Sequence, residues 1–401
     1  ISVQAKLRGQ KQSYELRNIS LNVNALTLKG DGVLNTSSPR PQLTATFSTE
    51  KVNVDPFLPH ETKSEPLLSK AETIDGAALG SRAIIESNKK KIAIPQSRYS
   101  TNSIDTALLG AIDADITVFA NKLIYQKFEV EGLAFKATLF DKLLTVREIA
   151  GKMFKGSFLL NFKFNGRRTP RLDGRFVVSK ANIGKALLRN GILGLKGGIT
   201  DFDLNFGSVG TNVLEIVSGL NGEGRLTSRG GVVSGIDLRA ISDRLKNIKG
   251  AKDLLSFLRP VMQGGQSRFS SLDAKILINK GIVRTEDLSL RADAAHGRIA
   301  GFADLPKWYM NFGTQFWLTE HPKVPAFKIQ TVGKIDNPKN FFDFKDLQSH
   351  MLQRGISKLI RKAFPGSRQP NAKKPPVEKD DKPRKPRLEE LIPGVFNLLT
   401  K

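Results

Sequence analysis

Apolar and polar residues alternate along most of this chain with a period of two. Leu43, Ala45 and Phe47, for example, are separated by single threonines. A period of two places successive side chains on opposite faces of a strand, so each such segment predicts a strand with one apolar face. These segments recur from residue 1 to about residue 58 and again from 104 to about 345. The pattern therefore predicts a mainly β protein.

The stretch Val213–Leu245 has the most varied pattern. It predicts, in order, a short apolar segment, a strand, a tight turn at Gly230-Gly231, a second strand and a helix capped by Asp237. Two adjacent glycines favour a turn because residues without a Cβ adopt positive φ at little cost. Aspartate is a preferred N-cap, and the apolar residues that follow it have helical spacing. These residues are Leu238, Ile241 and Leu245.

Between the two β-regions the alternation stops, and prolines and the run Lys89-Lys90-Lys91 indicate a linker or loop. After residue 345 a helical period appears, and then a Pro/Lys/Arg-rich sequence without apolar content, which is typical of disorder. The sequence thus predicts five segments. They are an upstream β-repeat (1–58), a linker or loop (59–103), the main β-region (104–345), an amphipathic helix (346–365) and a disordered basic tail with a short apolar end (366–401).

The predicted helix 346–365 is basic on its polar side. Such a helix can lie on a membrane surface, or it can cap the open end of a sheet, and we favour capping. The candidates for contact with a membrane or another anion are Arg354, Lys358, Arg361 and Lys362.

Charge and aromatic content narrow the class of partner. The 401 residues carry a formal net charge of +25, which favours a polyanion such as nucleic acid, anionic lipid or lipopolysaccharide. Phe is frequent (24) whereas Tyr (4) and Trp (2) are rare. Single-strand nucleic-acid binders stack bases on exposed aromatic residues, often including Tyr and Trp, so this balance favours a hydrocarbon-lined wall or a core over nucleic acid. An ordinary β core in a basic chain stays an open alternative.

The sequence contains no motif of a known catalytic site. Its four histidines lie far apart and none has metal-ligand spacing, and no phosphate-binding loop or nucleophile motif is present. We expect no enzyme, no cofactor and no metal. The absence of cysteine excludes disulfides and suits an oxidising compartment, although many cytosolic chains also lack it. The chain has no apolar run of about 18 residues and opens on Ile1 within a strand-like pattern, so we expect a fragment whose N-terminal anchor precedes it.

Three segments carry glycine and apolar patterns in a fixed order, without catalytic residues. The first is Leu220-x-Gly-x-Gly-x-Leu226 with Gly235-Ile-Asp-Leu238, the second is Gln266–Gly281, and the third is Val324–Pro338 with its Pro, Gly and Pro. Together these segments resemble the AsmA family of bacterial envelope proteins, which usually has Thr where this chain has Ser267.

The resemblance implies a periplasmic body in a Gram-negative envelope, held in the inner membrane by an N-terminal helix. It also implies an extended, curled antiparallel sheet, a repeating β-groove with a few short helices, along which phospholipid or another anionic lipid passes toward the outer membrane. Outer-membrane components are then further partners. A non-transporting scaffold or regulator of outer-membrane protein assembly is the alternative, and nucleic-acid binding through the basic tail is a distant third.

The lipid-groove candidates are apolar residues on one predicted face of successive strands. A sheet with one apolar face and few helices must close on itself, pair with another sheet or offer that face to lipid. The candidates are Phe158, Leu160, Phe162, Phe164, Phe176, Phe202, Leu204, Phe206, Ile276, Ile278, Phe312, Phe316, Phe327 and Ile329.

Overall fold

A computed structural model describes most of the two β-regions. The described residues are 2–23, 26–55, 98–125, 128–182, 194–246 and 265–343, together with 345–347, 349–350 and 353. The chain divides into two units, residues 1–352 and 353–401, and every element below belongs to the first. The predicted tail 366–401 and most of the predicted helix 346–365 lie outside the described residues.

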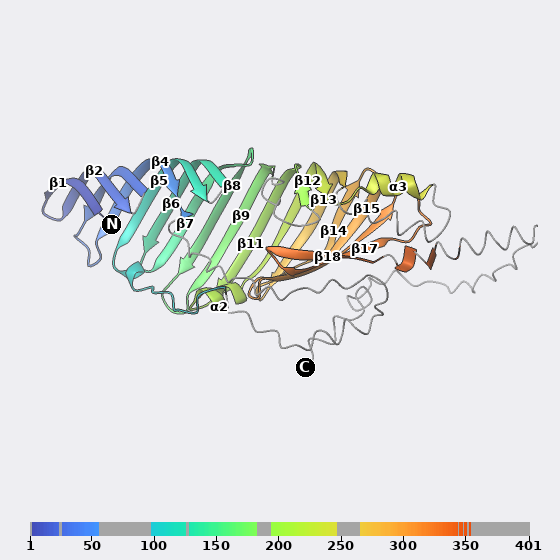
Figure 1. The fold of residues 1–401 in the computed structure, drawn as a ribbon. Coiled ribbons are helices and arrows are strands. Elements are labelled where there is room, and N and C mark those ends of the chain that lie inside the picture. Colours follow the sequence, from blue (N-terminus) through green and yellow to red (C-terminus); the bar gives the residue numbers. More distant parts are fainter. Residues whose placement is uncertain are drawn as a thin grey trace, which may run out of the picture. The chain divides into compact units, whose positions relative to one another are not determined.

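Eighteen strands form one sheet, with three short helical segments in the described residues (Figure 1). The first nine strands are β1 (Ser2–Gln10), β2 (Ser13–Val23), β3 (Leu26–Asn35), β4 (Gln42–Asn53), β5 (Asp113–Tyr125), β6 (Phe128–Phe140), β7 (Leu143–Met153), β8 (Gly156–Asn165) and β9 (Arg171–Ala181). The others are β10 (Gly194–Lys196), β11 (Ile199–Val209), β12 (Asn221–Ser234), β13 (Gln266–Asn279), β14 (Ile282–Ala292), β15 (Ala295–Asp304), β16 (Tyr309–Leu318), β17 (Phe327–Lys334) and β18 (Asn337–Asp343). The helical segments are η3 (Leu108–Gly110), α2 (Val213–Ser218) and α3 (Leu238–Leu245).

The strands pair almost entirely in chain order. Each pairs antiparallel with the next, except that β9 pairs with β11, the short β10 lies beside β12, and β4 pairs with β5 in parallel. The mainly β, extended sheet is confirmed, but the expected antiparallel pairing fails at β4–β5. A parallel pair needs a crossover connection, and the chain between these two strands is long enough to supply it. The sheet is therefore continuous from the upstream β-region into the main one.

The strand ends form two rims, which we name after the helix beside each (Figure 1). The α2 rim contains the strand ends Gln10, Asp113, Phe140, Asn165 and Val209, and the α3 rim contains Val23, Tyr125, Met153, Ala181 and Ser234.

Residues 98–112 run along the α2 rim and bond to its turns. The carbonyl of Ser100 accepts the Leu214 N–H at 3.1 Å, and the carbonyl of Leu109 accepts the Lys142 N–H at 3.2 Å. Such bonds satisfy backbone groups that the ends of strands and helices would otherwise leave unpaired. This segment therefore ties turns that belong to distant strands.

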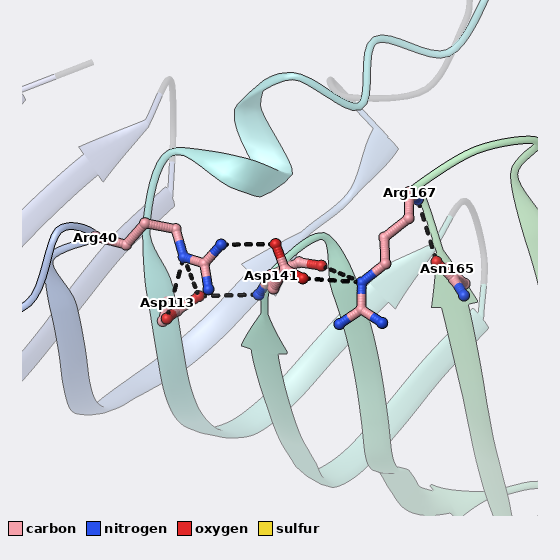
Figure 2. A network of polar contacts seen from close by, with 5 residues as sticks. All are labelled: Arg40, Asp113, Asp141, Asn165 and Arg167. Carbon is pink, nitrogen blue, oxygen red and sulfur yellow. Dashed lines mark hydrogen bonds and ion pairs between the residues drawn. The ribbon is translucent and has the colours of Figure 1, made fainter.

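A polar network fixes the parallel junction at the same rim (Figure 2). Asp113, only 7% exposed, accepts the Asp141 N–H at 2.9 Å and lies 3.2 Å from Nε of Arg40. Arg40 also donates to Asp141 at 2.6 Å, and Arg167 Nε lies 3.1 Å from that same carboxylate. Asn165 accepts the Arg167 N–H at 3.1 Å. Because a buried carboxylate is costly without partners, this network stabilises the start of β5 beside β4.

The predicted turn at Gly230-Gly231 is wrong, because both glycines lie within the single strand β12. Gly230 has a φ of +59°, yet pairing with β13 continues on either side of it. A Cβ on Gly231 would lie 2.6 Å from the ring of Phe269, so the missing side chain makes room for that ring. Gly231 thus serves close packing and Gly230 supplies the positive φ, and neither reverses the chain.

The predicted helix after Asp237 is confirmed as α3. The Asp237 side chain accepts the Ala240 N–H at 2.8 Å, which is the expected N-cap bond. Leu238 and Ile241 are each 1% exposed and face the sheet.

Candidate functional site

All fourteen lipid-groove candidates lie on one face of the sheet, which we call the apolar face. Directly paired residues of neighbouring strands point to the same side, so the register shows which residues share a face. Leu160 pairs with Phe176, Phe176 with Leu204, and Leu204 with Gly224, which pairs with Ile276. The same correspondence continues at the far end of the sheet, where Phe316 pairs with Phe327. The structure therefore brings together residues that are far apart in the sequence.

Three phenylalanines form a row across β8, β9 and β11. The ring centroids of Phe158 and Phe176 lie 6.5 Å apart, and those of Phe176 and Phe202 lie 6.0 Å apart. Glycines make room for neighbouring rings, since a Cβ on Gly174 would lie 2.6 Å from the ring of Phe206. The result is a nearly continuous hydrocarbon surface.

The apolar face is closed at one end. Phe316 (2% exposed), Phe327 (3%) and Ile329 (1%) are buried in a core cluster that includes Leu238 and Ile241 of α3. Because these three candidates are buried in that cluster, they do not line an accessible surface. Ile278 is also buried.

Over β8, β9 and β11 the apolar face is only half-buried. We call this part the open segment, and its residues are Phe158, Leu160, Phe162, Phe164, Phe176, Phe202, Leu204 and Phe206. Ile276 and Phe312, the two remaining candidates, are half-buried as well. Partial exposure of so many large apolar residues on one face is unusual for a protein surface and is typical of a binding surface.

The opposite face, which we call the charged face, carries cross-strand ion pairs together with some exposed apolar side chains, among them Leu159 and Leu277. Nε of Arg175 on β9 donates to Asp203 on β11 at 2.8 Å, and Arg225 on β12 lies 2.9 Å from Asp273 on β13. The hydrogen bond from Arg175 lowers the pKa of the Asp203 carboxyl, so this carboxylate stays ionised. The ion pairs thus lie on one face of the sheet and the row of phenylalanines on the other.

Sequence reasoning missed the polar network of Figure 2. Arg40 and Asp113 lie on segments that the linker separates, and no local pattern indicates that they meet. It also missed the stacking of His296 on Trp317 on the charged face, with ring centroids 5.3 Å apart. Their pairing on β15 and β16 depends on a register that alternation alone does not set.

The membrane-contact candidates Arg354, Lys358, Arg361 and Lys362 lie outside the described residues. None of the described helices is both long enough and apolar enough to cross a bilayer. Within the described ranges, no group of three or more His, Cys, Asp or Glu residues is placed to hold a metal ion.

Comparison with known proteins gives one match. The model of the AsmA family matches residues 1–288, which include most strands of the sheet and the whole open segment. No curated protein and no solved structure matches the chain.

Proposed function

The chain belongs to the AsmA family, and from that membership we propose that it carries phospholipid along its apolar face. In this proposal the protein works in the periplasm of a Gram-negative cell, is held at the inner membrane and supports biogenesis of the outer membrane. Its ligand is a phospholipid or another anionic lipid, and it performs no catalysis.

The open segment is the observation that carries the proposal. Its eight apolar residues remain half-buried, while the opposite face of β9 and β11 carries the Arg175–Asp203 ion pair. Covering an acyl chain with such a surface is favourable by about 0.8 kcal/mol for each CH₂ removed from water. Ten methylenes would therefore contribute roughly 8 kcal/mol before the costs of ordering the chain. A lipid tail is the ligand that matches this surface.

A non-transporting scaffold for outer-membrane protein assembly is the second candidate. The observation that favours it is the closed core that contains α3 residues, in which Phe316, Phe327 and Ile329 are buried by other side chains. A scaffold needs a rigid body and no ligand, so it requires the open segment to remain free of lipid.

Native mass spectrometry of the protein purified without detergent distinguishes the two candidates. We expect masses of the protein plus one or more phospholipids, because the half-buried open segment would otherwise face water. Extraction of the same sample under denaturing conditions identifies the lipid class. A protein that carries only its own mass, from cells rich in phospholipid, would support the scaffold instead.

A further inference from the structure

A hollow of about 640 Å³ lies at the α3 rim, at the ends of β6 to β9. A row of residues on the charged face forms part of its lining, since Lys152 pairs with Ser157 and Ser157 pairs with Ser179. Lys155 and Lys180 belong to the same lining; Lys155 lies in the turn between β7 and β8, and Lys180 is the next-to-last residue of β9. Their φ angles are +63° and +53°, so both residues have a left-handed backbone conformation near the strand ends. The hollow therefore brings three ammonium groups and two hydroxyl groups to one rim.

The three lysines carry more positive charge than their neighbours offset. All three are exposed, and within the described ranges no ion pair involves Lys152, Lys155 or Lys180. Of the two glutamates in the lining, Glu129 is bound by Lys122 at 3.0 Å. Glu131, which pairs with Lys152 in the strand register, and Asp201, which accepts the Lys180 backbone N–H at 3.0 Å, are two carboxylates against three ammonium groups, so the hollow suits an anionic ligand.

Aromatic side chains lie at the same rim. The rings of Phe128 and Phe154 meet edge to face at 5.6 Å, and Tyr125, 40% exposed, lies 6.4 Å from Phe128. The open segment begins nearby, because Phe158 is the third residue of β8 from this rim. We call the aromatic and basic residues together the rim patch. It consists of Tyr125, Phe128, Phe154, Lys152, Lys155 and Lys180.

We propose that the rim patch is where this protein contacts the surface of an anionic phospholipid bilayer. Tyrosine at a bilayer surface sits at the headgroup level, and lysine is attracted to the negative surface potential. At the α2 rim, by contrast, residues 98–112 run along the turns and bond to them, so we place the bilayer contact at the α3 rim. The inference rests on the proposed function, since a lipid that passes the α3 rim would have its tail near Phe158 and its phosphate near the lysines.

Vesicle co-flotation of the full chain tests this contact. The site variant is Lys152→Gln/Lys155→Gln/Lys180→Gln. The matched control is Lys11→Gln/Lys163→Gln/Lys275→Gln, which removes the same charge from three other exposed lysines. Both are mixed with phosphatidylcholine vesicles that do or do not contain phosphatidylglycerol. With phosphatidylglycerol present, we expect the site variant to bind on the order of a hundredfold more weakly than the wild type, and the control to bind nearly as the wild type does.

Three results would overturn the proposal. One is an equal loss in both triple variants, which would indicate general charge attraction, and another is no loss in the site variant. The third is a failure of inorganic phosphate to compete with vesicles. If phosphate binds at these lysines and vesicle binding stays unchanged, the lysines form a site for a soluble anion. Native mass spectrometry of the same samples separates this proposal from the proposed function. A site variant that keeps its bound phospholipid but no longer binds vesicles is the result that both proposals predict. Vesicle binding that depends on the three lysines, in a protein that carries no phospholipid, would contradict only the proposed function.

Discussion

Replacing Phe162 by aspartate is expected to remove most of the phospholipid that co-purifies with the protein. Phe162 lies on β8 in the open segment, is half-buried, and pairs with Val146 on β7 and Gly174 on β9. A carboxylate there must lose several kcal/mol of hydration when an acyl chain covers it, which amounts to at least about a tenfold loss of bound lipid. Quantitative mass spectrometry of extracted lipid measures the effect.

The control is Asn161→Asp, the preceding residue on the same strand. It introduces the same negative charge on the opposite face, and we expect its lipid content to equal that of the wild type. Circular dichroism establishes that both variants keep their strand content. If Phe162→Asp remains folded and keeps its full complement of lipid, the open segment is not the lipid site.

Replacing Ile241 by alanine is expected to destabilise the closed end of the sheet by about 2–5 kcal/mol, the range measured for buried isoleucine or leucine. Ile241 is 1% exposed and packs within the cluster that contains Phe316 and Phe327. Urea unfolding followed by circular dichroism measures the loss. Amide hydrogen exchange should locate it in α3 and β13 to β17.

Asp243→Ala is the matched control for this prediction, because it lies on the same helix at an exposed position and loses only a surface ion pair with Lys246, so stability should change by less than about 1 kcal/mol. In native buffer, Ile241→Ala should keep its phospholipid, since the open segment lies on other strands. A loss of lipid equal to that of Phe162→Asp would show that the closed core and the open segment act as one unit.

The local pattern was sufficient for most strands and for α3. Strict alternation marks most strands, and Asp237 followed by apolar residues at helical spacing marks the helix; both signals are contained in a few neighbouring residues. It did not mark β10 or β18. The same reasoning failed at Gly230-Gly231, because paired glycines suit a turn and also suit a strand whose neighbour needs space for a ring. The parallel pair β4–β5 was not predictable, since it depends on which distant strand occupies the edge of β4.

The sequence predicted which face of the sheet the candidate residues share, but not which of them are exposed. Alternation placed Phe162 and Phe327 on apolar faces, and the register confirms that these faces are one. Whether a residue is covered depends on where α3 docks, which the helix sequence alone does not specify. The five segment boundaries and the role of the basic helix remain predictions, because that helix lies largely outside the described residues.

Site-specific photo-crosslinking tests most directly whether lipid lies on the apolar face. A photoreactive phenylalanine analogue in place of Phe176 lies in the open segment on the apolar face. The same analogue in place of Val177 lies on the charged face of the same strand. Irradiation in cells, followed by mass spectrometry of the purified protein, should yield a phospholipid adduct at 176 and none at 177. Equal yields of phospholipid adduct at both positions, or none at 176, would contradict the account.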